Sequence, residues 1–274
     1  MSTPKSSNLS ITNSFELRSA EFSLTPSASL PELFAKNIQV SKSDTTKTNH
    51  LNIPDLLKYI LYINLDIRPD RLKHVQNEMN KLLVVGERVN AIKMPHGAVG
   101  CTMSHIKSLE LAKERGWPHV FICEDDIFFL NPELLKENLL KFFENKEIDW
   151  DVVIIGGNNC LPYERIADYC IKVSNNQTTT GYIVKAHYYD TLLANFRESA
   201  RRLLREPTKH KQYALDIYWK SLQTTDKWYM ITPPTVVQCE DYSDIEGRRV
   251  NYSGLMLDLD KEWLFKKEQL GKMW

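Results

Sequence analysis

A run of apolar, strand-forming residues that ends in three consecutive acids constrains the fold of this chain most. Residues 120–123 are Val, Phe, Ile and Cys, Glu124, Asp125 and Asp126 follow, and residues 127–129 are apolar again. Side chains alternate between the faces of a strand, so Glu124 and Asp126 point one way and Asp125 the other. Three adjacent carboxylates fit the carboxyl end of a strand, where Mg²⁺ or Mn²⁺ would neutralise them. A solvated acidic turn is the alternative.

Buried strands and amphipathic helices alternate along the chain. Residues 59–65 form an apolar run that predicts a buried strand, and Pro69 begins a helix to about residue 83. Further strands are predicted at residues 88–94, 151–157, 169–173, 178–184 and 228–232, and further helices at 101–115, 133–145, 186–204, 212–222 and in part of 255–274. This order predicts an α/β fold with an open sheet, whose ligands bind beyond the carboxyl ends of the strands.

The composition predicts one globular domain that follows a tail. Hydrophobic residues make up 42% of the chain, and 35 basic and 35 acidic side chains cancel, so no overall field attracts nucleic acid or an anionic membrane. Residues 1–50 are rich in Ser, Thr, Asn and Lys and show no sustained apolar period. We therefore expect a flexible tail over residues 1–50 and a single domain over residues 51–274.

The cysteines and the apolar runs indicate the compartment. The five cysteines are odd in number, scattered, and form no Cys-x-x-Cys pair, which argues against a zinc site or a disulfide framework. No run approaches the roughly 20 apolar residues of a membrane span, and the N-terminus lacks the apolar core of a signal peptide. A soluble, cytoplasmic protein is the expectation.

Polar residues follow the first strand at the edge where ligands are expected. Asn64, Arg68 and Arg71 lie between this strand and the body of the next helix. They would contact a nucleotide or its phosphates, or they would only cap the helix.

The segment before the helix at 101–115 reads as a short glycine loop, residues 96–100. Ser104 and His105 would then lie in the first helical turn, where free N–H groups and the helix dipole favour an anion. An anion-binding helix start and a cation-binding strand end would make a site for a metal–diphosphate. A purely structural hydrogen bond from His105 is the alternative.

Two later segments add candidate residues. Gly181 interrupts a strand and would let a substrate approach the backbone closely. Asp216 and Trp219 share a helix face at i, i+3 spacing, which suits a sugar that stacks on the ring while the acid binds or deprotonates a hydroxyl. An ordinary helix with a surface acid and a core tryptophan is the alternative.

Five segments in this order resemble glycosyltransferase family 25, the lipooligosaccharide galactosyltransferases of bacteria and the related collagen galactosyltransferases. The segments cover roughly residues 58–247: Tyr-Ile-Asn-Leu at 62–65 with Arg68, Asp70 and Arg71; Gly-Cys-Thr-Met-Ser-His at 100–105; Glu-Asp-Asp at 124–126; Asp-Ile-Tyr-Trp at 216–219; and Pro234 through Gln238 to Ser-Asp-Ile at 243–245.

The resemblance implies a GT-A type domain with a mixed, mostly parallel sheet, and a role in lipopolysaccharide biosynthesis or protein glycosylation. It implies inverting transfer of a hexose, galactose or glucose, from a UDP-sugar to a hydroxyl of a glycan, lipooligosaccharide or glycoprotein acceptor, with Mn²⁺ or Mg²⁺. Asp126 would hold the metal with Glu124 or Asp125 helping, and Asp216 would be the base, with Asp244 its rival. The donor would lie against a further set of residues: Asn64, Arg68, Arg71, Gly100, Ser104, His105, Asp125 and Gly181.

Two other functions and one departure stay open. A carbohydrate- or protein-binding module of the same fold would keep the site without turnover. A metal-dependent phosphohydrolase is disfavoured, because the early Asp-x-Asp with a following Thr is missing. Many metal-dependent GT-A enzymes also add a late histidine to the metal, whereas the last histidine here is His210, so a carboxylate or Asn replaces it or metal dependence is weaker. Acceptor identity and a homodimer are left open.

Overall fold

The computed structural model describes residues 51–243 and 247–263. The chain divides into two units, Met1–Thr48 and Asn49–Trp274, and the described residues belong to the second. The predicted tail at 1–50, the candidate base Asp244 and the end of the chain beyond residue 263 therefore lie outside the described residues.

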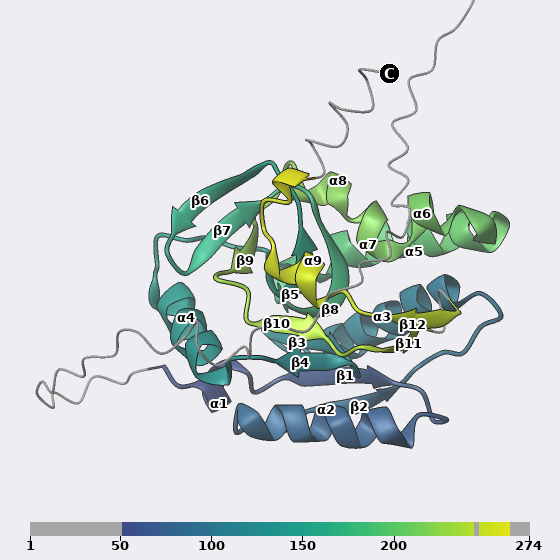
Figure 1. Cartoon of the computed structure of the whole chain (residues 1–274), viewed down its shortest axis with the longest axis horizontal. Helices are drawn as coiled ribbons and strands as arrows, with labels where there is room; N and C mark the ends of the chain where they lie inside the picture. The colour runs from purple at the N-terminus through teal and green to yellow at the C-terminus, as the bar shows by residue number, and fades with distance from the viewer. Residues whose placement is uncertain (1–50, 244–246, 264–274) are drawn as a thin grey trace, which may run out of the picture. The chain divides into compact units, whose positions relative to one another are not determined.

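The centre of the described unit is an eight-stranded mixed sheet in the order β2-β1-β3-β8-β5-β9-β7-β6 (Figure 1). Strands β7 and β8 run against the other six, so the sheet is mostly parallel in direction. The strands are β1 (Ile60–Asn64), β2 (Glu87–Asn90), β3 (His119–Glu124), β5 (Val152–Asn159), β6 (Tyr163–Ala167), β7 (Cys170–Val173), β8 (Asn176–Lys185) and β9 (Trp228–Ile231). The predicted α/β class is confirmed.

Helices cover both faces of the sheet because alternate strand residues bury on opposite sides. Helices α3 (Gly97–Glu114) and α5 (Tyr189–Arg205) pack on one face with Leu61, Ile122 and Ile154. Helices α2 (Pro69–Lys81) and α4 (Pro132–Glu144) pack on the other with residues such as Tyr62 and Phe121. Shorter helices are α1 (Ile53–Leu56), α6 (His210–Tyr213), α7 (Leu215–Tyr218), α8 (Lys220–Gln223) and α9 (Ser253–Leu257), and the 3₁₀ turns are η2 (Ala186–Tyr188) and η3 (Pro207–Lys209).

Local sequence accounts for where the main helices begin and end. Pro69 and Pro132 occupy the first helical positions of α2 and α4, where a missing N–H has no cost. The side chain of Asn131 caps α4 by accepting from the N–H of Leu134 at 3.1 Å. Gly116, with φ +62°, ends the α3 segment, as a C-terminal glycine commonly does.

Two small antiparallel ribbons lie next to the acidic segment. Strand β4 (Ile127–Phe129) pairs with β10 (Val236–Gln238), and Gln238 stands opposite Ile127. Strand β11 (Asp241–Ser243) pairs with β12 (Arg248–Val250). The first ribbon therefore brings residues far along the chain beside the acids, and β6, β10, β11 and β12 were not predicted.

Two predicted helices differ from the structure. Helix α3 begins at Gly97 and not at residue 101, so residues 97–100 form its first turn. The prediction of a glycine loop at these residues was therefore wrong. The predicted helix at 212–222 is three short helices, α6, α7 and α8, separated at Ala214 and Trp219. Ala214 has ψ 144°, which breaks the helical path.

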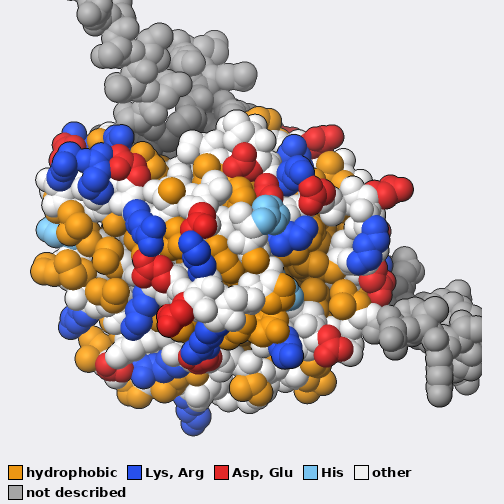
Figure 2. Space-filling view, turned by 180° about the vertical axis from the view of Figure 1, so that it is seen from behind, with side chains coloured by type: hydrophobic (Ala, Val, Ile, Leu, Met, Phe, Trp, Pro, Cys, Tyr) orange, Lys and Arg blue, Asp and Glu red, His pale blue; other side chains and the backbone are white. Residues whose placement is uncertain are grey.

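The surface carries mixed charge, and none of the described helices is both long and apolar enough to cross a membrane. On the face shown in Figure 2, basic and acidic side chains are interspersed with apolar ones. This distribution agrees with the formal net charge of zero.

Gly100 is required by a close backbone approach. A Cβ at this position would lie 2.4 Å from the carbonyl oxygen of Ile92. We expect Gly100→Ala to lower the free energy of unfolding by roughly 1–3 kcal/mol, since the overpacking exceeds the gain in helix propensity. Denaturant unfolding curves measure the change.

Gly254 in α9 is the matched control, because a Cβ there meets nothing within 4 Å. Gly254→Ala should leave stability unchanged or raise it by up to about 1 kcal/mol. Equal effects of the two substitutions would contradict the packing argument for Gly100.

Candidate active site at the end of strand β3

The three acids occupy the end of β3 and the turn that follows it, as predicted. Glu124 is the last residue of β3, and Asp125 and Asp126 form the turn before β4. The side-chain amide of Gln238 lies 3.4 Å from Oε2 of Glu124 and 3.5 Å from Oδ1 of Asp126. Glu124 and Asp126 therefore point to the same side of the strand end, toward Gln238. In the sequence, Gln238 is part of a segment that resembles the family but is not a predicted site residue.

Asp125 points to the other side, toward the edge formed by β1 and α2. Its Oδ2 accepts from the amide of Asn64 at 2.7 Å, and its Oδ1 accepts from Nη1 of Arg71 at 3.1 Å. Asn64 is 1% exposed and also accepts from Nε of Arg88 at 2.9 Å. The predicted residues Asn64, Arg71 and Asp125 thus lie together, with Arg88 as an additional brace.

Arg71 ties the acidic turn to strand β11. Besides Asp125, its Nη1 lies 3.4 Å from Oδ2 of Asp126, and its Nε donates to Asp241 at 2.9 Å. Asp241 also binds Arg68, which donates in addition to Asp70. Arg68 therefore pairs with two carboxylates through Nε and Nη2. Asp241 lies in the polar segment after Gln238 but was not among the predicted site residues.

A hollow of about 180 Å³ lies beside this ion-pair network. Arg71 and Asp126 form part of its wall, together with His74 and the segment that precedes β11. Its lining residues are Asp70, Arg71, His74, Asp126, Cys239, Glu240 and Asp241. The guanidinium of Arg71 and the carboxylate of Asp126 therefore border the same hollow.

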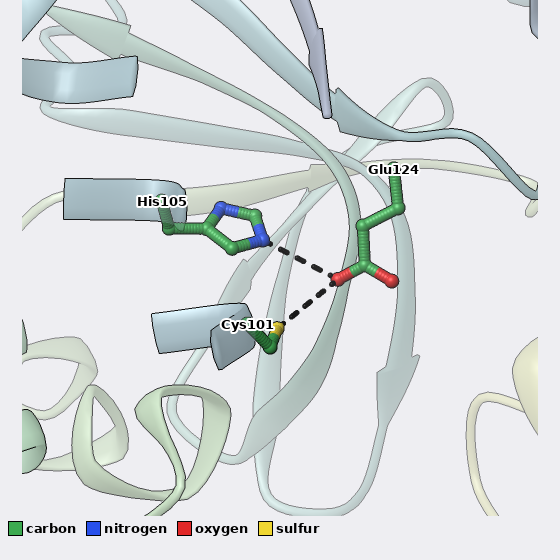
Figure 3. Close-up of side chains that lie close together, drawn as sticks. All are labelled: Cys101, His105 and Glu124. Carbon is green, nitrogen blue, oxygen red and sulfur yellow. Dashed lines mark hydrogen bonds and ion pairs between the residues drawn. The ribbon is translucent and has the colours of Figure 1, made fainter. Parts of the chain in front are cut away.

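Glu124 has a second set of partners on helix α3 and strand β8. Its Oε1 accepts from the hydroxyl of Thr179 at 2.5 Å, lies 3.4 Å from Nε2 of His105 and 4.0 Å from Sγ of Cys101 (Figure 3). The other ring nitrogen of His105, Nδ1, is 2.8 Å from the hydroxyl of Tyr182. His105 therefore reaches the site from a fully buried position.

Gly100, Ser104 and Gly181 support the site without facing it. Ser104 lies beyond the first turn of α3, and its hydroxyl accepts from the N–H of Ile92 at 2.8 Å and donates to the carbonyl of Gly100 at 2.7 Å. The first-turn, anion-binding placement of Ser104 and His105 was thus wrong. A Cβ on Gly181 would lie 3.0 Å from Ile127 and 3.2 Å from Phe121, so this glycine accommodates core side chains.

Asp216 lies near the acids, but the predicted sugar platform beside it does not exist. Its Oδ2 accepts from the N–H of Thr178 at 3.1 Å, and the charge of Glu124 contributes to its raised pKa after burial, the larger cause. Trp219 is fully buried and donates from Nε1 to the carbonyl of Asn176 at 2.9 Å. It is a core residue, and no sugar ring can stack on it.

The electrostatics of the cluster show an excess of negative charge. Burial and then the neighbouring charge of Glu124 raise the pKa of Asp126 to about 8. Burial also raises the pKa of Asp125, although Arg71 opposes the shift. Burial disfavours the charged form of Glu124 too, but its hydrogen bonds from His105 and Thr179 outweigh this and lower its pKa. One proton or one cation is therefore favoured between Glu124 and Asp126.

Part of the chain is similar to one family of known proteins. Residues 90–207 match the model of glycosyltransferase family 25, described as an LPS biosynthesis protein. An inactive glycosyltransferase 25 family member 3 of Mus musculus is 25% identical over 177 residues, which cover 63% of this chain and 28% of the relative. A probable inactive member 3 of Bos taurus is 22% identical over 265 residues, covering 71% of this chain and 44% of the relative. The chain spans less than half the length of these curated relatives.

One solved structure is a glycosyltransferase involved in the glycosylation of the major capsid of PBCV-1. It aligns with a TM-score of 0.43 at 8% identity, covering 66% of this chain and 93% of that chain. The family match and the curated relatives confirm the resemblance that the sequence motifs indicated: residues 90–207 of this chain are similar to glycosyltransferase family 25.

Proposed function

We propose that the chain is an inverting, metal-dependent glycosyltransferase of the GT-A type that moves a hexose from a UDP-sugar to a hydroxyl acceptor. A glycan, a lipooligosaccharide or a glycoprotein is the acceptor class that the family suggests. The observation that carries the proposal is the half-buried carboxylate pair of Glu124 and Asp126, whose two charges face one neutral amide and are only partly offset by Arg71.

The residues present fit a hard divalent cation. Oε2 of Glu124 and Oδ1 of Asp126 are carboxylate oxygens that face a single amide group, that of Gln238, at 3.4 and 3.5 Å. Carboxylate oxygens are the ligands that Mn²⁺ and Mg²⁺ favour. When bound there, the cation would supply Lewis-acid stabilisation of the departing diphosphate.

The chain's own residues would bind and orient the donor beside that pair. Arg71 holds Asp125 and Asp126 in place and borders the hollow, so it is our candidate for the contact with a donor phosphate. Asn64 keeps Asp125 fixed through the 2.7 Å hydrogen bond and thereby leaves the oxygens of this turn preoriented.

Inversion requires a base that takes the proton of the acceptor hydroxyl, and Asp216 is our candidate. Burial raises its pKa, which suits a group that must accept a proton, and the N–H of Thr178 orients one of its oxygens. Asp244 is kept as the rival for this role.

A binding module that has lost turnover is the second candidate, and the relatives described as inactive favour it. The two functions differ in whether a bound UDP-sugar is cleaved. Both predict nucleotide binding at the acidic turn.

Thermal unfolding with UDP and Mn²⁺ tests the donor site. At about 100 times its Kd, a ligand that binds only the folded state stabilises it by roughly 2.7 kcal/mol. We expect UDP with Mn²⁺ to raise the melting temperature, either ligand alone to act weakly, and ATP to act less than UDP. Asp126→Asn should abolish the effect, because it removes one carboxylate from the pair.

Asp190→Asn is the matched control, because Asp190 is an exposed acid on α5 that pairs with Lys113 far from the turn. It should behave as wild type. A UDP shift of equal size in Asp126→Asn would contradict the assignment of Asp126.

The same binding should depend on pH through Asp126. Its raised pKa of about 8 means that the carboxyl carries a proton below that pH, and the cation must displace this proton. The apparent Mn²⁺ affinity should therefore fall as pH decreases below about 8, by up to about tenfold per unit for one displaced proton. Titration calorimetry with Mn²⁺ at pH 6, 7 and 8 measures it, and an affinity that is independent of pH would refute the protonated carboxyl.

Asp216→Asn separates catalysis from binding. The amide can keep the contact with the N–H of Thr178 but cannot take a proton. We expect the turnover number for sugar transfer, or for UDP-sugar hydrolysis without acceptor, to fall by roughly 10²–10⁴-fold. The UDP–Mn²⁺ shift should stay within error, and a turnover number within a few-fold of wild type would move the base to another residue.

A further inference from the structure

Three different ligand atoms converge at the inner side of the acidic strand end. Cys101 and His105 are one turn apart on helix α3, and Glu124 ends β3 (Figure 3). The i, i+4 spacing puts both helix residues on the face that meets the strand. Sγ of Cys101, Nε2 of His105 and one carboxylate oxygen of Glu124 all lie within 4.8 Å of one another.

We propose that Cys101, His105 and Glu124 form a binding site for a thiophilic divalent cation of the Zn²⁺ class. In a tetrahedral zinc site with bonds of about 2.0–2.3 Å, the ligand atoms lie about 3.3–3.6 Å apart. The distance from Nε2 of His105 to Oε1 of Glu124 is 3.4 Å, which already has this value, and the distance from that oxygen to Sγ is 4.0 Å. Cys101 would complete the site by bringing Sγ closer to the other two atoms, all three of which already lie within 4.8 Å of one another.

The surroundings of His105 support a ligand role. Metal-binding histidines usually engage their second ring nitrogen in a hydrogen bond that fixes the ring. Here Nδ1 lies 2.8 Å from the hydroxyl of Tyr182, and the ring stacks on that of Tyr182 at 5.7 Å between centroids. Thr179 likewise fixes Glu124 by donating to Oε1. Two of the three ligands are therefore held in place before any cation arrives.

The donor set also selects the cation. A thiolate and an imidazole favour Zn²⁺ or Co²⁺ over Mg²⁺ or Mn²⁺. Binding sends the thiol proton of Cys101 to solvent. The ring proton of His105 moves from Nε2, which faces Glu124, to Nδ1, where the hydroxyl of Tyr182 accepts it. Three protein ligands leave a fourth position for water, as in exchangeable rather than structural zinc sites.

This site does not rest on the proposed transferase function. It uses Oε1 of Glu124, whereas Oε2 and Asp126 face Gln238 on the other side. A variant that destroys the pair with Asp126 should therefore leave the thiophilic site intact.

The experiment is a Co²⁺ titration of the chelator-treated full chain, followed by absorption. A thiolate bound to Co²⁺ gives a sulfur-to-metal charge-transfer band, which oxygen ligands at Asp126 do not give. We expect this band with one Co²⁺, its loss on adding Zn²⁺, and its absence in Cys101→Ser. Tyr182→Phe should keep the band and weaken the Co²⁺ affinity about 10–100-fold, the usual effect of removing a hydrogen bond to a metal-binding histidine.

Two control variants make the result specific. Cys239 lies 3.4 Å from Nε2 of His74 and is the other cysteine–histidine contact of the described residues, so Cys239→Ser should retain the band. Asp126→Asn should retain it as well while losing the Mn²⁺-dependent UDP shift. A band lost in Cys239→Ser but kept in Cys101→Ser would overturn the proposal, as would no band in the wild type.

A wild-type measurement covers the case in which Cys101→Ser does not fold. Zn²⁺ should slow alkylation of Cys101 at least tenfold, read by mass spectrometry of the digested chain, while Cys160 serves as the internal reference. Equal alkylation rates at Cys101 with and without Zn²⁺ would also overturn the site.

Discussion

The arrangement of this site depends on the balance between the three carboxylates at the end of β3 and the guanidinium of Arg71. Glu124, Asp125 and Asp126 follow one another at the end of β3, and Arg71 pairs with the last two at 3.1 and 3.4 Å. Arg71 is shared with Asp241, so its charge is divided among three acids. Helix α2, the acidic turn and strand β11 are thereby tied together. Burial and then the charge of Glu124 raise the pKa of Asp126, whereas hydrogen bonds from Arg68, the N–H of Tyr242 and Arg71 outweigh burial and lower the pKa of Asp241.

Helix α3 shows how a short segment serves two purposes through helical spacing. Gly100 and Ser104 are one turn apart, and both contact the backbone of Ile92. Gly100 leaves room for the carbonyl of Ile92 because it has no side chain, and the hydroxyl of Ser104 accepts from the N–H of Ile92. Cys101 and His105 are each one position further and face Glu124 instead. A rotation of about 100° per residue separates the two pairs, so the structural pair fixes the helix from which the other pair reaches the site.

The sequence predicted the parts of this site that depend on local pattern. The alternation along β3 placed Glu124 and Asp126 on one side, and the order of strands and helices placed Asn64 and Arg71 at the same edge. The predicted start of α3 was wrong because two glycines suggested a loop. Gly100 lies within the helix, and a larger residue there would collide with the carbonyl oxygen of Ile92. Gln238 reaches the acids through the pairing of β10 with β4, and Asp241 is linked to them through Arg71; both contacts span more than 100 residues of sequence, which no local period reveals. A Cys–His–Glu group divided between a helix and a strand is equally invisible to a search for Cys-x-x-Cys spacing.

The free-energy cost of placing Glu124 and Asp126 together is relevant to the choice between a transferase and an inactive module. A buried carboxylate without a full counter-charge costs folding free energy, and replacement of such groups by apolar residues is often neutral or stabilising. Thr179, His105 and Arg71 offset part of this cost for Glu124 and Asp126, while the two acids share a single neutral amide at 3.4 and 3.5 Å. Ligand binding would give a reason to keep the two acids together, because a cation converts the repulsion between the two carboxylates into attraction for a shared charge. Under the proposed function, a bound donor or metal would offset the cost of this pair, and turnover would depend on whether Asp216 reaches the acceptor.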